Sequence, residues 1–192
     1  MSNLDLKVRG GEWINLVIRE ASQELRDNFA LVLAGLRRPG GGTLYWNGRD
    51  AWRNIVAFRN SLRLITASPE LFLSLTVAEN LNFYTSLFSL RGSVRSAYLK
   101  NIDSDELVTF LSANRLFMLK MATVLTSPRP LVVCSYPLER LNAGQYELVC
   151  KDLRSFMEDS RLVVTVDTAR NDYASTNQVI RPGKLQEAKD NV

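Results

Sequence analysis

The most informative absence from this chain of 192 residues is histidine, of which there is none. This absence excludes a Ser-His-Asp triad and every metal site that needs a histidine ligand. Only two cysteines are present, Cys134 and Cys150, which is too few for a disulfide framework, and we expect both to be reduced and structural. The longest apolar stretch, residues 29–36, is far shorter than the roughly eighteen residues that a membrane helix needs. We therefore expect one globular domain that does not span a bilayer.

The basic charge of the chain has no single location. The net charge is +4, and the arginines and lysines are spread along the sequence instead of forming one basic segment. Such a spread is typical of solvated surfaces and is compatible with a position near anionic lipid. It gives weak support to a basic nucleic-acid-binding module, which we keep as a second alternative function. The first nine residues lack the apolar block of a secretion signal, so we expect no secretion.

Strand-like and helix-like patterns alternate along the chain, which is typical of an α/β domain with a largely parallel sheet. Apolar runs predict strands over residues 4–8, 13–18, 43–46, 62–66, 130–134, 162–166 and 178–180. Helical periodicity predicts helices over residues 25–36, 77–90, 113–124 and 143–156. Three residues have the character and spacing of helix caps: Thr76, Ser112 and Asn142. Thr76 forms a capping box with Glu79. The predicted fold is a sheet with helices packed against it.

Four segments occur in an order that resembles the ATP-binding subunits of ATP-binding-cassette (ABC) transporters. Residues 11–12 are Gly-Glu before a strand, and residues 33–36 are Leu-Ala-Gly-Leu, followed by Pro39 and Gly42. Residues 71–81 are similar to the family's segment after its glutamine loop, and residues 110–115 lie where its Leu-Ser-Gly-Gly-Gln signature belongs. The resemblance extends from near the N-terminus to about Ile180. Residues 12–13, 44–48 and 79–84 are most similar to the cytochrome c maturation subunit of a haem-handling ABC complex.

The resemblance implies a P-loop-NTPase-like sheet flanked by helices, with a small, reduced helical subdomain. We expect one nucleotide-binding-like domain over residues 1–184, with the helical subdomain at about 77–127. Residues 185–192 are expected to form a flexible C-terminal tail.

The phosphate-binding motif of the family, Gly-x-x-x-x-Gly-Lys-Ser/Thr, departs from its pattern here. Its slots hold Glu20, Leu25, Arg26 and Asp27, so no glycine remains to let the backbone approach a phosphate. Arg26 is a cation that could replace the lysine, although the simpler interpretation is an exposed helix residue. Carboxylates in and beside the loop would repel a triphosphate. If nucleotide binding is retained, Arg26, Asp27 and Ser112 are the positional equivalents that would contribute to it.

Four further family positions hold residues unsuited to the family's chemistry. Ser135 and Tyr136 occupy the places of the metal-binding aspartate and the catalytic glutamate. A lone hydroxyl is a poor Mg²⁺ ligand, and a tyrosine with a pKa of about 10 is a poor base at neutral pH. Asp167 lies where the family has its switch histidine, and Ala67 where it has the glutamine. Ser112 keeps the signature serine, which would complete a site in a partner subunit, but its simpler role is an N-cap.

These departures lead to a hypothesis of a degenerate ABC subunit without catalytic residues, a metal site or a required cofactor. Its expected role is structural or regulatory, in an ABC-type membrane complex, and the resemblance implies haem handling in cytochrome c maturation. The alternative is a divergent but active ATPase subunit that uses ATP and Mg²⁺. The resemblance implies an integral membrane subunit as partner, contacted through Ala67, Ser68, Phe72 and Glu79, and a second ABC subunit in a homo- or heterodimer, with no nucleic acid. The implied location is the cytoplasmic face of the inner membrane, or the matrix side in a mitochondrion.

Overall fold

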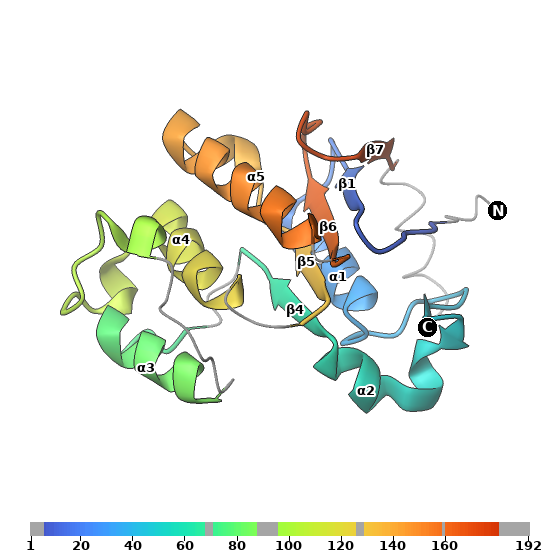
Figure 1. The fold of residues 1–192 in the computed structure, drawn as a ribbon, viewed down its shortest axis with the longest axis horizontal. Coiled ribbons are helices and arrows are strands. Elements are labelled where there is room, and N and C mark those ends of the chain that lie inside the picture. The colour runs from blue at the N-terminus through green and yellow to red at the C-terminus, as the bar shows by residue number, and fades with distance from the viewer. Residues whose placement is uncertain (1–5, 68–70, 88–95, 126–128, 159, 181–192) are drawn as a thin grey trace.

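A five-stranded parallel sheet forms the centre of the computed structural model, which describes residues 6–67, 71–87, 96–125, 129–158 and 160–180 (Figure 1). Its strands, in spatial order, are β4 (Leu62–Ile65), β5 (Leu131–Cys134), β6 (Leu162–Asp167), β1 (Trp13–Val17) and β7 (Thr176–Val179). Every neighbouring pair is parallel. The predicted α/β fold with a parallel sheet is confirmed, and the predicted C-terminal strand does form one edge.

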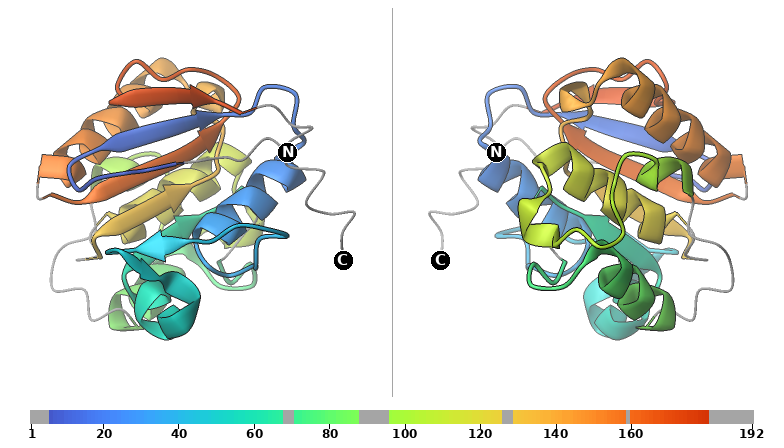
Figure 2. Two further views of the ribbon diagram at one scale, coloured as in Figure 1. Left: turned by 90° about the vertical axis from the view of Figure 1, so that its right-hand side faces the viewer. Right: turned by 90° about the vertical axis from the view of Figure 1, so that its left-hand side faces the viewer.

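Helices cover both faces of the sheet, giving three layers (Figure 2). One face packs against α1 (Gln23–Leu33) and α2 (Ile55–Asn60). The other packs against α4 (Ala113–Val124) and α5 (Ala143–Glu158). Because successive strand residues point to opposite faces, Trp13 belongs to the α4 and α5 side and Ile14 to the α1 and α2 side. Strand β1 is buried along its whole length for this reason.

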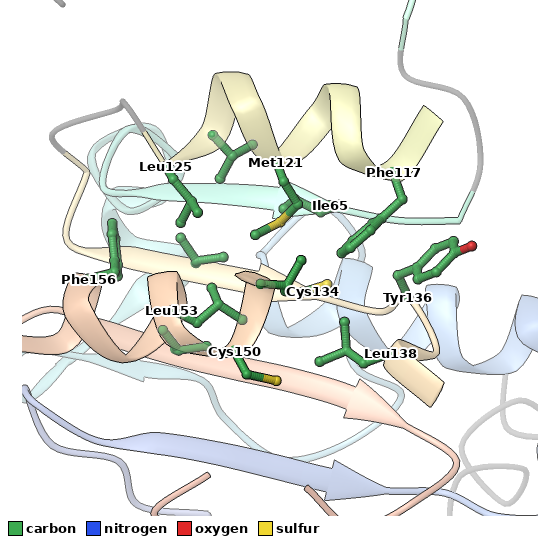
Figure 3. Packing of buried hydrophobic residues seen from close by; sticks show 14 of the residues in the cluster. Ile65, Phe117, Met121, Leu125, Cys134, Tyr136, Leu138, Cys150, Leu153 and Phe156 are labelled. Atoms are coloured by element: carbon green, nitrogen blue, oxygen red, sulfur yellow. The ribbon is translucent and has the colours of Figure 1, made fainter. Parts of the chain in front are cut away.

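The core between the sheet and the helices α4 and α5 is mainly aliphatic (Figure 3). Met121 of α4, Leu125 at the C-cap of that helix, and Leu153 and Phe156 of α5 converge on β5. Cys134 and Cys150 are both buried in this core, which agrees with the structural role expected from the sequence. Burial raises the pKa of the Cys150 thiol, so it stays protonated at neutral pH.

A smaller helical part lies beside the sheet and has its own apolar cluster. It contains α3 (Val77–Leu87), α4 and two 3₁₀ segments, Ser96–Leu99 and Val108–Phe110. The cluster is formed by Leu71, Val77, Val108, Leu111 and Leu119. The predicted caps form here and in α5. Thr76 and Glu79 exchange hydrogen bonds at the start of α3, and Asn142 accepts from the N–H of Gln145 at 2.9 Å. The subdomain limits of about 77–127 stay a prediction, and residues 185–192 lie outside the described residues.

Three features differ from the sequence-based expectation. Residues 6–8 form no strand, although a strand was predicted over residues 4–8; Leu6 and Val8 instead pack singly against the core. The strand predicted over residues 43–46 shortens to β2 (Tyr45–Trp46), which turns at Asn47-Gly48 and pairs with β3 (Arg49–Asp50). The helix α2 was not predicted, because its six residues are too few for a clear periodicity.

Candidate functional site

The carboxyl edge of the sheet gathers most of the candidate residues. Arg26 and Asp27 lie in the first turns of α1, after β1, and Ala67 follows β4. Ser135 and Tyr136 follow β5, and Asp167 ends β6. Since all five strands are parallel, their carboxyl ends share one edge, the usual place for ligands in such sheets. Asp27 and Ala67 line one surface hollow of about 430 Å³ together with Gln23, Glu24, Asn28 and Leu31.

The connection between β1 and α1 is short and contains no glycine. Residues 18–22 are Ile-Arg-Glu-Ala-Ser, and Ser22 is the N-cap of α1, where its hydroxyl accepts from the N–H of Leu25 at 3.2 Å. The helix therefore begins at Gln23, before the position of Arg26. A side chain thus satisfies a backbone donor that would otherwise face an anion at the helix N-terminus. Glu24 adds a negative charge to the same turn, where the helix dipole favours one.

The side chain of Arg26 folds back onto the loop that precedes it. Its guanidinium donates to the carbonyl of Ala21 at 2.5 Å and to Oε1 of Gln23 at 2.9 Å, while Nε has no hydrogen-bond partner among the described residues. Arg26 is only 3% exposed, so the interpretation as an exposed helix residue is wrong. Long helical side chains point toward the helix N-terminus, which here leads the guanidinium into the protein. Burial lowers the pKa of Arg26, and the charge of Asp167 opposes that shift.

Asp27 and Ser135 form a direct hydrogen bond between α1 and the end of β5. The hydroxyl of Ser135 donates to Oδ1 of Asp27, across 108 residues of sequence. Gln23 bridges the same two residues: its amide donates to Oδ1 of Asp27 at 2.9 Å and to the carbonyl of Ser135 at 2.8 Å. The structure thus brings together two sequence-predicted residues and adds Gln23, which sequence reasoning missed.

Tyr136 is part of the core and faces α4 (Figure 3). Its ring stacks on Phe117 with the centroids 4.2 Å apart, and its hydroxyl donates to Oδ1 of Asn114. Asn114 in turn donates to the carbonyl of Arg140 at 2.8 Å. Burial raises the pKa of Tyr136, which keeps it protonated and unable to act as a base at neutral pH. The residue therefore joins the start of α4 to the loop after β5.

Asp167 is buried and is held by backbone donors. Its carboxylate accepts from the N–H groups of Leu138 at 3.1 Å and Thr168 at 2.7 Å. Burial, together with a hydrogen bond to Glu139, raises the pKa of Asp167 to about 7. Glu139 also accepts a hydrogen bond from the hydroxyl of Thr168. Both carboxyl groups line a cavity of about 260 Å³ at the start of α5.

The remaining predicted residues lie away from this edge or have local roles. Ser112 is the N-cap of α4 and accepts from the N–H of Arg115 at 3.4 Å, as its simpler interpretation predicted. Phe72 is 45% exposed and contacts the ring of Phe83, their centroids 4.8 Å apart. Glu79 is engaged in the capping box of α3. Ser68 lies outside the described residues.

The residues at this edge do not fit ATP and Mg²⁺ in the way a glycine-rich loop does. A triphosphate needs bare backbone N–H groups, a cation facing it and a metal held by oxygen ligands. Here residues 18–27 contain no glycine, and Arg26 is turned onto its own loop. In the part of the chain that the structure describes, no three Cys, Asp or Glu side chains are grouped so that they could hold a metal ion.

Sequence reasoning did not assign Gln23 or Asn114 a role at the site, and it did not predict the contact that Glu139 makes. Gln23 lies one turn before Asp27, so the i, i+4 pairing of a glutamine amide with a carboxylate was a usable signal. No local signal pointed to Asn114 or Glu139, because their partners, Tyr136 and Thr168, are distant in sequence.

Comparison with known proteins gives two kinds of match. No protein-family model matches the chain. It is 34% identical over 83 residues to the cytochrome c biogenesis ATP-binding export protein CcmA 2 of Salmonella paratyphi A, and 33% identical over 81 residues to CcmA of Salmonella typhi. These matches span 43% and 42% of this chain but only 40% and 38% of the relatives.

Solved structures match over nearly the whole chain at low identity. The dimeric structure of MJ0796, a bacterial ABC transporter cassette, has a TM-score of 0.74 at 17% identity and covers 95% of this chain and 87% of its own. CbiO1 from Clostridium perfringens, part of the ABC transporter complex CbiONQ, has a TM-score of 0.69 at 14% identity, with 99% and 85% covered. The chain therefore has the fold of ABC ATP-binding cassettes and is homologous, over about two-fifths of its length, to CcmA ATP-binding subunits.

Proposed function

We propose that this chain is an ABC-cassette-type subunit that serves a membrane complex as a structural or regulatory partner, without turning over ATP. The observation that carries the proposal is the conformation of Arg26. The cation that would face a nucleotide is 3% exposed and donates to Ala21 and Gln23 of its own loop. Freeing it would require breaking these hydrogen bonds, and the loop would still offer no glycine for a phosphate to approach.

The loss of nucleotide chemistry would extend to the other family positions. Tyr136 packs in the core and Asp167 accepts two backbone N–H groups, so neither side chain is available to a reacting phosphate. Removal of one preorganised group commonly costs about 2.7–4 kcal/mol in the transition state. Several such losses together would leave no useful hydrolysis.

Calorimetric titration of the full chain with ATP and Mg²⁺ tests this part of the proposal. We expect no heat of binding and no thermal shift at millimolar nucleotide, and no phosphate release in a turnover assay. Mg²⁺-dependent ATP turnover that Arg26→Ala abolishes would reject the proposal and favour the alternative of a divergent, active ATPase subunit.

An exposed aromatic cluster supports a membrane subunit as the partner. Phe72 and Phe83 are 45% and 42% exposed, and Tyr84 contacts both rings. Exposed apolar patches of this kind are typical of interaction sites. Of the helices that the structure describes, none is both long and apolar enough to cross a bilayer. The proposed partner would place the chain at the cytoplasmic or matrix side of the membrane. Homology to CcmA supports a complex of cytochrome c biogenesis, in which haem is the substrate that the resemblance implies.

Affinity purification from the native membrane tests the partner. We expect an integral membrane subunit, with or without a second cassette subunit, to be recovered with the wild-type chain. Phe72→Ser should reduce this recovery several-fold, whereas Val56→Ser, at a 66% exposed position on α2, should leave it unchanged. Recovery of nucleic-acid-binding proteins instead, with salt-dependent binding to nucleic acid, would favour the second alternative.

A further inference from the structure

We infer that Gln23, Asp27 and Ser135 form an internal clasp that links α1 to β5 in place of a bound nucleotide and metal ion. The clasp consists of three hydrogen bonds that meet at the end of β5. Oδ1 of Asp27 accepts from the hydroxyl of Ser135 and from the amide of Gln23, and the carbonyl of Ser135 accepts from the same amide. Ser135 is fully buried, and its N–H donates to the carbonyl of Ile65, which extends the hydrogen bonding between β5 and β4 by one residue.

The chemistry of the pair is the reverse of the arrangement that the resemblance implies. There the helix carries the serine or threonine and the strand end carries the aspartate, whereas here the carboxylate is on α1 and the hydroxyl follows β5. The exchange keeps one donor and one charged acceptor in contact. Hydrogen bonds to an ionised acceptor are roughly twice as strong as neutral ones. The two residues are thus complementary to each other in this chain.

The clasp also acts on the first turn of α1. The first turn of α1 extends from the edge of the sheet, and the loop before it contains no glycine to wrap around an anion. Gln23 and Asp27 are one turn apart and both reach the end of β5, so they fix the orientation of that turn. This inference rests on the proposed function, because a subunit that binds no nucleotide needs another link between α1 and β5.

A double-mutant cycle with Asp27→Ser, Ser135→Asp and the double exchange tests the clasp. Asp27→Ser removes the shared acceptor, and Ser135→Asp sets two carboxylates against each other. We expect each single variant to lower the midpoint of thermal unfolding by roughly 4–8 °C. The double exchange restores one carboxylate and one hydroxyl in contact, so it should recover at least half of the summed loss. Additive losses in the double variant would overturn the inference.

A milder pair of variants keeps the test valid if the exchanges do not fold. Gln23→Met removes both amide donors at similar volume, and Glu24→Met makes a matched change in the same turn at a residue outside the clasp. Hydrogen exchange of the amides in residues 23–27 should accelerate roughly tenfold in Gln23→Met. Equal exchange in the two variants would contradict the clasp.

Addition of MgATP to the same samples separates this inference from the proposed function. A thermal shift of the wild-type chain together with non-additive losses in the cycle would reject the proposed function and leave the clasp in place. No shift together with additive losses would reject the clasp and leave the proposed function in place.

Discussion

Gly35 is the residue at which backbone conformation and packing most clearly forbid a side chain. It has a φ of +66°, and a Cβ atom there would lie 2.8 Å from Ile55 and 2.9 Å from Phe58. Its carbonyl also accepts two hydrogen bonds from Arg59, at 2.9 and 2.7 Å. We expect Gly35→Ala to lower the free energy of unfolding by about 2–4 kcal/mol, because it adds both strain and overpacking. Urea unfolding measures this loss.

Gly41 is the matched control for that substitution. A Cβ atom at Gly41 would meet nothing within 4 Å, and its φ is not in the left-handed region. Gly41→Ala should therefore change the free energy of unfolding by less than about 0.5 kcal/mol. Similar losses of unfolding free energy in the two variants would mean that the close approach of α2 does not exclude a side chain at Gly35.

At the scale of elements, Tyr136 links α4 to the loop after β5 by two separable contacts. Tyr136→Phe removes only the hydroxyl that donates to Asn114. Because Asn114 is half-buried and accessible to water, we expect the free energy of unfolding to fall by about 1 kcal/mol. Tyr136→Ala also removes the ring that stacks on Phe117, so it should lower the free energy of unfolding by about 3–5 kcal/mol. Chemical unfolding of the two variants measures the difference, and equal losses would show that the ring contributes nothing beyond the hydroxyl.

At the scale of the whole molecule, the raised pKa of Asp167 makes stability depend on pH. With a pKa of about 7 when folded and about 3.8 when unfolded, Asp167 binds a proton in the folded state that the unfolded chain has released. The folded state therefore binds more protons between these values, and the contribution of this group to stability falls as pH rises from about 4 to about 7. Burial is the main cause, and the adjacent Glu139 acts in the same direction.

The stability difference between the wild-type chain and Asp167→Asn isolates this contribution, because the other titrating groups are common to both. We expect the difference, wild type minus variant, to decrease as pH rises from 4.5 to 7.5 and to level off above that range. The charged groups that interact with Asp167 are Glu139, which raises its pKa, and Arg26. A difference that does not vary with pH would show that Asp167 is ionised throughout.

Much of the architecture could be predicted because local patterns specify it. The alternation of apolar runs with helical periodicity implied the parallel sheet, and Thr76, Ser112 and Asn142 do cap the helices that they precede. Caps are predictable since donor and acceptor lie within one turn of each other. The short helix α2 escaped prediction, although Asp50 and Asn54 are caps at its approach and Ile55 and Phe58 share its inner side.

The sequence by itself determined the α/β fold with its parallel sheet, the starts of α3, α4 and α5, and the absence of glycine from the loop before α1. The tertiary structure alone decided the burial of Arg26, the contact of Asp27 with Ser135 and the stacking of Tyr136 on α4. The physical reason is the difference in sequence separation between the residues that interact. Periodicity and capping act within a few residues, whereas these contacts depend on the order of the strands, which brings residues 108 positions apart to one edge of the sheet.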